Sequence, residues 1–424
     1  MPQIKKNWLA SSIVYQLFTG RAATASIIHH RGKVFNLLLQ HDFSPLLSHG
    51  LNCLYLLGVF DNTGPLIVRE ESGHDLTATA NRLPSVFAVS NHQRPNPNLG
   101  TQAELVTLIR HLQDQGFHVI LDFVPNHTGT THPWVKTHPE YYHHHQPGQF
   151  VAEFSGDVYK LNYANQELRR HMLSVLTTIA SWGADGVRVD MAHLVPTDFW
   201  HQAITALRAD YPDFIFIAEA YPSSPLDLSP LKDLLATGFH AVYNSPLYHN
   251  LHAFFSGSPL GHTLAHVNYT RANFAPNQLI NYISNHDDPA PPAAATYLEA
   301  LLALILFSPG IPFIVGGLLS GRFHRLAHHY YDELTAGQLD SHLPPVINRL
   351  FNLRSHLNPS ATAAHEHHNL LKLDLTTNQK PALLFANFDS LRRPLAAPAT
   401  SPGLLRHTPP AASLAPGQAE LFFV

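Results

Sequence analysis

The sequence predicts an α/β fold in which a parallel sheet carries its helices on the outside. Short apolar runs rich in β-branched and aromatic residues recur along the chain, and segments of helical period lie between several of them. Repeated strand–helix–strand order is typical of parallel sheets. The repeated order of strands and helices does not by itself distinguish a closed barrel from an open doubly wound sheet. The predicted strands cover residues 13–18, 51–60, 118–124, 186–190, 214–220, 279–284 and 312–317.

Length and composition indicate a large folded chain with a substantial core. The 424 residues suggest two to three domains unless one barrel takes up most of them. Hydrophobic residues make up 45% and charged residues 13%, which argues against disorder. The net charge is −4 and no cluster of Lys and Arg is present, so we expect no nucleic-acid partner.

The lack of a recognisable targeting signal and the presence of a single cysteine predict a cytoplasmic location. The first 21 residues contain no sustained apolar segment followed by a small-residue cleavage site, so we expect no secretory signal. No apolar run reaches the roughly 18 residues of a membrane span, so we expect no membrane partner. Cys53 is the only cysteine, and an internal disulfide is therefore excluded.

Helical patterns precede several of the predicted strands. Residues 101–116 and 165–183 have helical period, and the apolar segment 297–307 predicts a buried helix that ends before Ser308. A Tyr- and His-rich insertion at residues 128–160 follows the third strand. We expect it to lie over the carboxyl ends of the strands, where α/β proteins bind ligands.

The alternation of strands and helices ends after the helical segment 346–357. Residues 369–388 predict a hairpin with its turn around 376–380, and the chain closes with a further strand. We therefore predict a catalytic domain at residues 1–363, including the inserted loop domain at 128–160, and a small β domain at residues 364–424.

Polar side chains close four of the predicted strands. The carboxyl ends of parallel strands lie on one face, so these groups should converge there despite their separation in sequence. One such carboxylate alone would more often cap a helix. The groups are Asp122, Asn126, His127, Arg188, Asp190, Glu219, Asn285, His286 and Asp287.

Two carboxylates in this set have contrasting surroundings. Arg188 and Asp190 share one face of a strand, so the guanidinium should lower the pKa of Asp190 and keep it ionised, as a nucleophile requires. The apolar run before Glu219 predicts a raised pKa, as a general acid requires. Such a pair is the apparatus of a glycosidase. A buried ion pair that fixes a barrel layer is the structural alternative for Arg188 and Asp190.

Four collinear motifs resemble the signature regions of the α-amylase superfamily, glycoside hydrolase family 13. They are DFVPNH (122–127), GVRVDMAH (186–193), FIAEAY (216–221) and YISNHD (282–287). The resemblance covers roughly the first 360 residues. It implies a (β/α)8 TIM barrel with a short loop domain inserted after the third strand and a small C-terminal β-sandwich domain.

The resemblance also implies roles for the matching residues. Asp190 would be the nucleophile that forms a glycosyl-enzyme, Glu219 the acid and then the base, and Asp287 the carboxylate that stabilises the distorted sugar. Arg188 would orient Asp190, and His127 and His286 would hydrogen-bond sugar hydroxyls.

Supporting positions follow from the same motifs. Asp122 and Asn126 would brace the loops, and Asn126 matches a calcium-ligating position in many family amylases. The insertion is short and offers few acidic ligands, whereas calcium prefers six or more oxygens. We therefore expect no required cofactor, with calcium at Asn126 as the alternative.

Two substrate-binding positions depart from the family pattern. Phe87 stands where members often have a sugar-stacking Tyr, so stacking would survive without the hydroxyl. His193 stands where typical α-amylases carry Lys, which argues against endo-hydrolysis of a polymer. Tyr141 and Tyr142 in the insertion either form a sugar-stacking wall or pack the insertion on the barrel.

The predicted activity is that of a retaining glycoside hydrolase that cleaves α-glucosidic bonds of α-linked oligosaccharides or glucans. One alternative is a transglycosylase or isomerase of the same superfamily, related to trehalose or sucrose. Another is a catalytically silent sugar-binding barrel.

Overall fold

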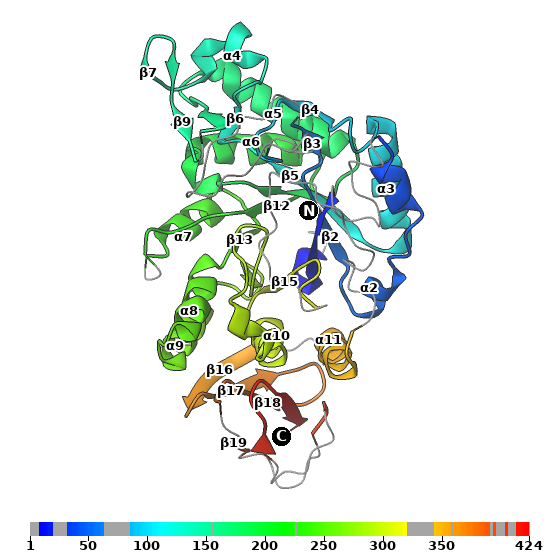
Figure 1. Cartoon of the computed structure of the whole chain (residues 1–424), viewed down its shortest axis with the longest axis vertical. Coiled ribbons are helices and arrows are strands. Elements are labelled where there is room, and N and C mark those ends of the chain that lie inside the picture. Colours follow the sequence, from blue (N-terminus) through cyan, green and yellow to red (C-terminus); the bar gives the residue numbers. More distant parts are fainter. Residues whose placement is uncertain are drawn as a thin grey trace, which may run out of the picture.

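The computed structural model forms a closed barrel of eight parallel strands (Figure 1). It describes residues 8–19, 32–62, 85–154, 156–224, 227–319, 343–357, 360–390, 393–395, 403–405 and 413–423. The barrel strands are β1 (Val14–Phe18), β2 (Cys53–Leu57), β5 (His118–Phe123), β11 (Gly186–Val189), β12 (Ile215–Ala218), β13 (Ala241–Tyr243), β14 (Leu279–Tyr282) and β15 (Ile311–Val315). This closure decides between the barrel and the open sheet.

Each predicted strand coincides with one barrel strand, and β13 is a further strand that the pattern did not predict. It has only three residues, and it completes the barrel by pairing Val242 with Ala218 of β12 and with Leu279 of β14. Its strand geometry therefore depends on its two neighbours.

Two predicted helices are confirmed together with their end signals. In α3 (Gln102–Gln115), Thr101 and Glu104 form a capping box and Gly116 ends the helix with a left-handed backbone, φ 106°. In α5 (Gln166–Ser181), the Asn165 side chain accepts from the backbone N–H groups of Glu167 and Leu168. These polar caps fix where each helix begins.

Further helices link and cover the barrel strands. The buried helix predicted before Ser308 is α10 (Leu298–Phe307). The others are α1 (Val34–Leu39), α2 (Ser44–Ser48), α6 (Thr197–Asp210), α7 (Ser229–Ala236), α8 (Ser245–Phe255), α9 (Leu260–Asn273) and α11 (Pro345–Leu357), with short 3-10 turns at Trp8–Ser11, Ala192–Leu194 and Pro292–Ala295. Among the described residues, none of the helices combines the length and apolarity needed to cross a membrane.

The insertion follows the third barrel strand, as predicted. Its elements gather at the end of the molecule away from the C-terminal sheet (Figure 1). They are β6 (His127–Gly129), α4 (Trp134–Thr137), a 3-10 turn (Pro139–Tyr141), β7 (His144–Gln146), β8 (Gln149–Phe150), β9 (Ala152–Glu153) and β10 (Val158–Lys160). A second short antiparallel pair, β3 (Phe60–Asp61) and β4 (Asn91–Pro95), precedes α3.

A C-terminal sheet packs against α9 and α10 (Figure 1). It contains β16 (Ser360–His367), β17 (Leu370–Thr376), β18 (Ala382–Asn387) and β21 (Ala419–Phe423), and β17 and β18 form the predicted hairpin. A short pair, β19 (Arg393–Pro394) and β20 (Ser413–Leu414), adds Leu395 and Leu414 to a small apolar cluster with Phe385 and Phe422 of the sheet. The Asn268 amide of α9 donates to the Ala364 carbonyl over 2.9 Å, which ties the sheet to the barrel.

Candidate active site at the carboxyl ends of the strands

One guanidinium holds three carboxylates together inside the barrel. Arg188 lies opposite Asp122 in the β11–β5 register, so both side chains point to the same side of the sheet. Arg188 Nη1 lies 2.9 Å from Asp122 Oδ1 and 3.0 Å from Asp190 Oδ1, and Nη2 bonds Glu219 Oε1. Arg188 is fully buried, so these charge-assisted hydrogen bonds act with little screening by water.

The backbone sets Asp190 and Glu219 side by side at adjacent strand ends. Asp190 N–H donates to the Phe123 carbonyl over 2.8 Å, and Glu219 N–H donates to the Val189 carbonyl over 2.9 Å. These bonds extend the parallel ladder one residue past β11 and β12, so the two carboxylates follow the carboxyl ends of the strands.

Met191 turns the chain sharply after Asp190. Its φ is 44°, a left-handed conformation that a side chain with a Cβ rarely adopts. The turn aims Met191 N–H at Glu219 Oε2 over 3.0 Å, and the Trp200 indole N–H donates to the Ala192 carbonyl over 2.9 Å. A strained backbone thus supplies one donor to Glu219.

The pKa of Asp190 is raised well above its ordinary value. Burial is the largest cause, the negative charge of Glu219 adds to it, and Arg188 opposes both without offsetting them. Arg188 lowers the pKa of Asp190, as expected, but the expectation of a net lowered pKa is wrong because burial and the charge of Glu219 outweigh the guanidinium. Asp190 Oδ2 is buried and has no hydrogen-bond partner among the described residues.

His286 and Asp287 follow β14 and face a residue of the first strand. The Gln16 amide nitrogen lies 2.8 Å from His286 Nδ1, and His286 Nε2 lies 3.0 Å from Asp287 Oδ2. Gln16 and His286 are fully buried, whereas Asp287 retains 33% of its side-chain exposure. Asp287 is therefore the more accessible of these carboxylates, while Gln16 holds the imidazole in place.

Phe87 lies at the same cluster but its ring is mostly covered. The ring stacks on His286 with centroids 5.1 Å apart, and the Arg188 guanidinium carbon lies 5.7 Å from its centroid. Only 8% of Phe87 is exposed. The structure therefore places Phe87 against His286 and Arg188, where it packs the charged groups.

His127 and Asn126 begin the insertion, and both are buried. Burial lowers the pKa of His127 to about 4. The neutral imidazole suits a hydrogen-bonding role toward a sugar hydroxyl. Its ring also contacts Phe154 edge-on at 5.3 Å.

The groups around Asn126 do not fit calcium. Asn126 Nδ2 donates to Glu153 Oε2 over 2.6 Å, and the Lys160 ammonium lies 2.8 Å from Glu153 Oε1. A lysine charge thus stands beside the nearest carboxylate, where a cation would need oxygen ligands. The described part of the chain contains no group of three His, Cys, Asp or Glu side chains able to hold a metal.

His193 lies near the acid–base candidate. Its ring contacts Tyr221 at 6.3 Å, and burial lowers its pKa. By contrast, Tyr141 and Tyr142 are fully buried, and the Tyr142 hydroxyl bonds Thr128 over 2.8 Å. Those two tyrosines pack the insertion, which decides against a sugar-stacking wall.

The structure adds residues that the sequence reasoning did not single out. The Tyr221 hydroxyl lies 3.2 Å from Glu219 Oε1 and 3.2 Å from Asp288 Oδ2. Gln16 and Met191 also contact the predicted site residues. Tyr221 lies two residues after Glu219, and Asp288 directly follows Asp287. Their closeness in sequence to these motif carboxylates was the signal that could have identified them.

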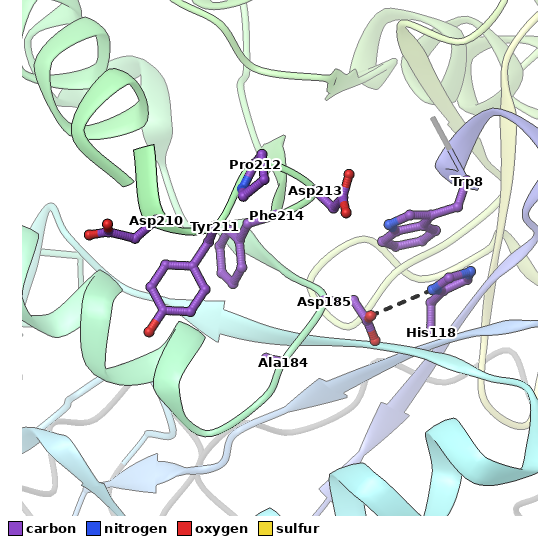
Figure 2. A pocket seen from close by; sticks show the side chains of 9 residues that line it. All are labelled: Trp8, His118, Ala184, Asp185, Asp210, Tyr211, Pro212, Asp213 and Phe214. Carbon is purple, nitrogen blue, oxygen red and sulfur yellow. Dashed lines mark ion pairs between the residues drawn. The ribbon is translucent and has the colours of Figure 1, made fainter. Parts of the chain in front are cut away.

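A separate pocket opens at the amino ends of the strands. It has a volume of about 470 Å³ and lies between Trp8, which stacks on His118, and the Asp210–Phe214 loop (Figure 2). Asp185 Oδ1 lies 3.6 Å from His118 Nδ1. These residues precede or begin β5, β11 and β12, so the pocket lies at the opposite end of the barrel from Asp190 and Glu219.

Known proteins similar to this chain come from the α-amylase superfamily. The family model for the α-amylase catalytic domain matches residues 84–150. An α-1,4-glucan:maltose-1-phosphate maltosyltransferase of Rhodospirillum rubrum is 32% identical over 209 residues, 46% of this chain and 29% of that protein. A cyclomaltodextrinase of Geobacillus thermopakistaniensis is 26% identical over 67% of this chain and 50% of its own. Both matches thus span half or less of the relatives' length.

The fold likeness extends over nearly the whole chain. The crystal structure of an α-amylase from Lactobacillus plantarum superposes with a TM-score of 0.74 at 21% identity, covering 98% of this chain and 99% of that one. At this identity the likeness concerns the fold: the barrel together with the C-terminal sheet.

Proposed function

Because the chain belongs to the α-amylase superfamily, we propose that it is a retaining glycoside hydrolase acting on α-glucosidic bonds of α-linked oligosaccharides. The observation that carries the proposal is the Arg188 guanidinium, which joins Asp190 and Glu219 at adjacent strand ends. Retaining glycosidases need two neighbouring carboxyl groups, one as nucleophile and one as acid and base.

Each carboxyl group has a defined part in this reaction. Asp190 must be ionised to attack, and Arg188 is the group that favours this form against burial. Its oxygen bonds the anomeric carbon while the glycosidic C–O bond breaks, and Glu219 gives its proton to the leaving oxygen. Water then attacks the same carbon, Glu219 takes the water's proton, and the bond to Asp190 breaks. The two inversions leave the anomeric configuration unchanged.

The remaining site residues position these groups. We assign the attack to Asp190 Oδ2, which is buried and has no hydrogen-bond partner in the part of the chain that the structure describes. Asp287, next to the buried His286, would bind hydroxyls of the distorted sugar, and neutral His127 would accept or donate a hydrogen bond to a further hydroxyl. His193, beside Tyr221, would contact the leaving-group side.

Removal of either carboxylate tests the proposal. We expect Glu219→Gln to lower the rate on maltotriose by about 10²- to 10⁴-fold, the range for a lost general acid. Asp190→Ala should abolish turnover. The control is Asp198→Ala, which removes a carboxylate that is 68% exposed on α6 and ion-paired with Arg169.

Turnover that persists in both Glu219→Gln and Asp190→Ala would exclude the proposed catalytic roles of Glu219 and Asp190. Binding of maltotriose without turnover by the unmodified protein, across a panel of α-linked sugars, would instead support the silent sugar-binding barrel.

Transfer to a sugar acceptor is the second candidate, because the similar relatives include maltosyltransferases as well as a cyclomaltodextrinase. Both outcomes share the covalent intermediate, and the accepting molecule decides between them. Incubation with maltose 1-phosphate and maltohexaose separates the two. Phosphate release with chains longer by one maltosyl unit supports transfer, whereas new reducing ends without longer chains support hydrolysis.

A further inference from the structure

One hydroxyl joins two carboxyl groups at the proposed acid–base residue. Tyr221 Oη lies 3.2 Å from Glu219 Oε1 and 3.2 Å from Asp288 Oδ2. A phenol has a single hydrogen and donates to one acceptor at a time. If both carboxyl groups were ionised, the hydroxyl would donate to one of them. Its oxygen would then face the negatively charged oxygen of the other with no hydrogen between them. A proton on one of the two carboxyl groups removes this conflict, because the protonated carboxyl can then donate to the phenol oxygen.

The neighbours of the two carboxyl groups indicate where this proton resides in the free protein. Glu219 accepts from the Arg188 guanidinium and from Met191 N–H over 3.0 Å, and a positive partner favours the ionised form. Among the described residues, the neighbours of Asp288 Oδ2 at hydrogen-bond distance are neutral: Tyr221 Oη, Asn285 Nδ2 at 3.2 Å and the Tyr282 hydroxyl at 3.5 Å. The proton thus belongs on Asp288.

The charged surroundings of Asp288 agree with this location. Burial raises the pKa of Asp288 first, and the negative charges of Asp287 and Glu219 raise it further. His249 of α8 acts in the opposite direction, and it does not reverse the shift. The titratable groups that face Asp288 are Glu219, Tyr221, Tyr248, His249, Tyr282 and Asp287.

We propose that Asp288 stores the catalytic proton and passes it to Glu219 through Tyr221. The Asp288 carboxyl gives its proton to Tyr221 Oη while the Tyr221 hydroxyl gives its own to Glu219 Oε1. An O–H bond breaks at Asp288, one O–H bond forms and one breaks at Tyr221, and an O–H bond forms at Glu219. The phenol stays neutral, and one negative charge moves from Glu219 to Asp288. This inference rests on the proposed acid–base role of Glu219.

The transfer also changes what Arg188 holds. A protonated Glu219 oxygen no longer attracts the guanidinium, so Arg188 keeps Asp190 and Asp122 as its anionic partners. Protonation of Glu219 also removes one of the negative charges that raise the pKa of Asp190. This favours an ionised nucleophile beside a protonated acid, as the first step of a retaining mechanism requires. After product release the proton returns to Asp288, and Glu219 pairs with Arg188 again.

Two substitutions interrupt the relay at different points. Tyr221→Phe removes the bridging hydroxyl, and Asp288→Asn keeps a donor toward Tyr221 but has no proton to transfer. The matched control is Tyr248→Phe, whose hydroxyl donates to the Pro289 carbonyl over 3.2 Å and whose ring stacks on Tyr282 at 5.5 Å. The control removes a hydroxyl from the same aromatic cluster without touching Glu219.

The assay compares maltotriose with maltosyl fluoride, whose leaving group departs with little need for a proton. For both relay variants we expect kcat/KM on maltotriose to fall by on the order of tenfold or more. The basic limb of its pH profile should move to lower pH, because the two carboxyl groups no longer share one proton. With maltosyl fluoride, the relay variants should stay within about twofold of the unmodified protein and of Tyr248→Phe.

Two results would overturn the relay. Equal losses on both substrates at every pH would show that Tyr221 and Asp288 only support the fold of the site. Unchanged pH profiles in both variants would show that Glu219 gains its proton by another route. If Glu219→Gln itself retained full activity, the proposed function would fail, which is a distinct outcome.

Discussion

Replacement of His266 by Gln should make the stability of the protein less sensitive to acid. His266 lies on α9 with 7% of its surface exposed, and its Nε2 lies 2.9 Å from Asn244 Oδ1. Asn244 in turn donates to Asn281 over 2.9 Å, and Asn281 donates to the Pro309 carbonyl over 3.0 Å. Gln supplies a donor for Asn244 but cannot acquire a proton.

The expected magnitude follows from the pKa of His266. Burial lowers this pKa from 6.5 to about 4, so the folded protein resists protonation of His266 more than the unfolded chain does. The stability contribution of neutral His266 is complete above pH 6.5 and is lost as the pH falls toward the folded-state pKa. At about pH 5 the linkage relation gives a loss of about 2 kcal/mol from this one side chain.

Urea unfolding followed by tryptophan fluorescence, at about pH 7.5 and about pH 5, measures the effect. The free energy of unfolding of His266→Gln should fall by about 2 kcal/mol less between the two pH values than that of the unmodified protein. His262→Gln, an exposed position on the same helix, is the control. An equal fall in all three proteins would refute the assignment of His266 as a buried neutral group.

Three further predictions concern the site. Arg188→Met should lower the free energy of unfolding by about 3–5 kcal/mol because it leaves buried carboxylates without their cation. The thermal midpoint of Arg188→Met should lie below that of the unmodified protein, and the difference should shrink as the pH falls. A difference that stays constant with pH would count against this reasoning. Met191→Val should cost about 1–2 kcal/mol more than Met191→Gly because a β-branched residue resists φ of 44°; equal unfolding midpoints would contradict that. EDTA should leave the thermal midpoint unchanged because Lys160 stands beside Glu153; a midpoint raised by added calcium would argue for a calcium site.

The local motifs were sufficient to predict where the central groups lie. Asp190 and Glu219 follow apolar strand segments directly, and parallel strands bring their carboxyl ends to one face. The contact between Arg188 and Asp190 also followed from the two-residue period of a strand. Such features depend on neighbours in sequence and on a known direction of the chain.

The sixth strand of the barrel, β13, could not be predicted from the alternation of apolar and polar residues. Residues Ala241–Tyr243 are too few for a period-two signal, which needs about four residues or more. Pairing with β12 and β14 makes this segment a strand. Its side chain Tyr243 then packs beside Arg188, with the ring centroid 5.6 Å from the guanidinium carbon.

The sequence by itself determined seven of the eight barrel strands, the strand ends that carry polar groups and the three candidate catalytic carboxylates. Only the tertiary structure decided how charge is shared among them. Arg188 bonds Asp122 and Glu219 as well as Asp190. Burial, together with the negative charge of Glu219, reverses the expected pKa shift of Asp190. The closed barrel likewise brings Gln16 to His286, and the paths of the chain after β12 and β14 bring Tyr221 to Asp288. Protonation depends on distances between groups that are remote along the chain, and folding alone sets those distances.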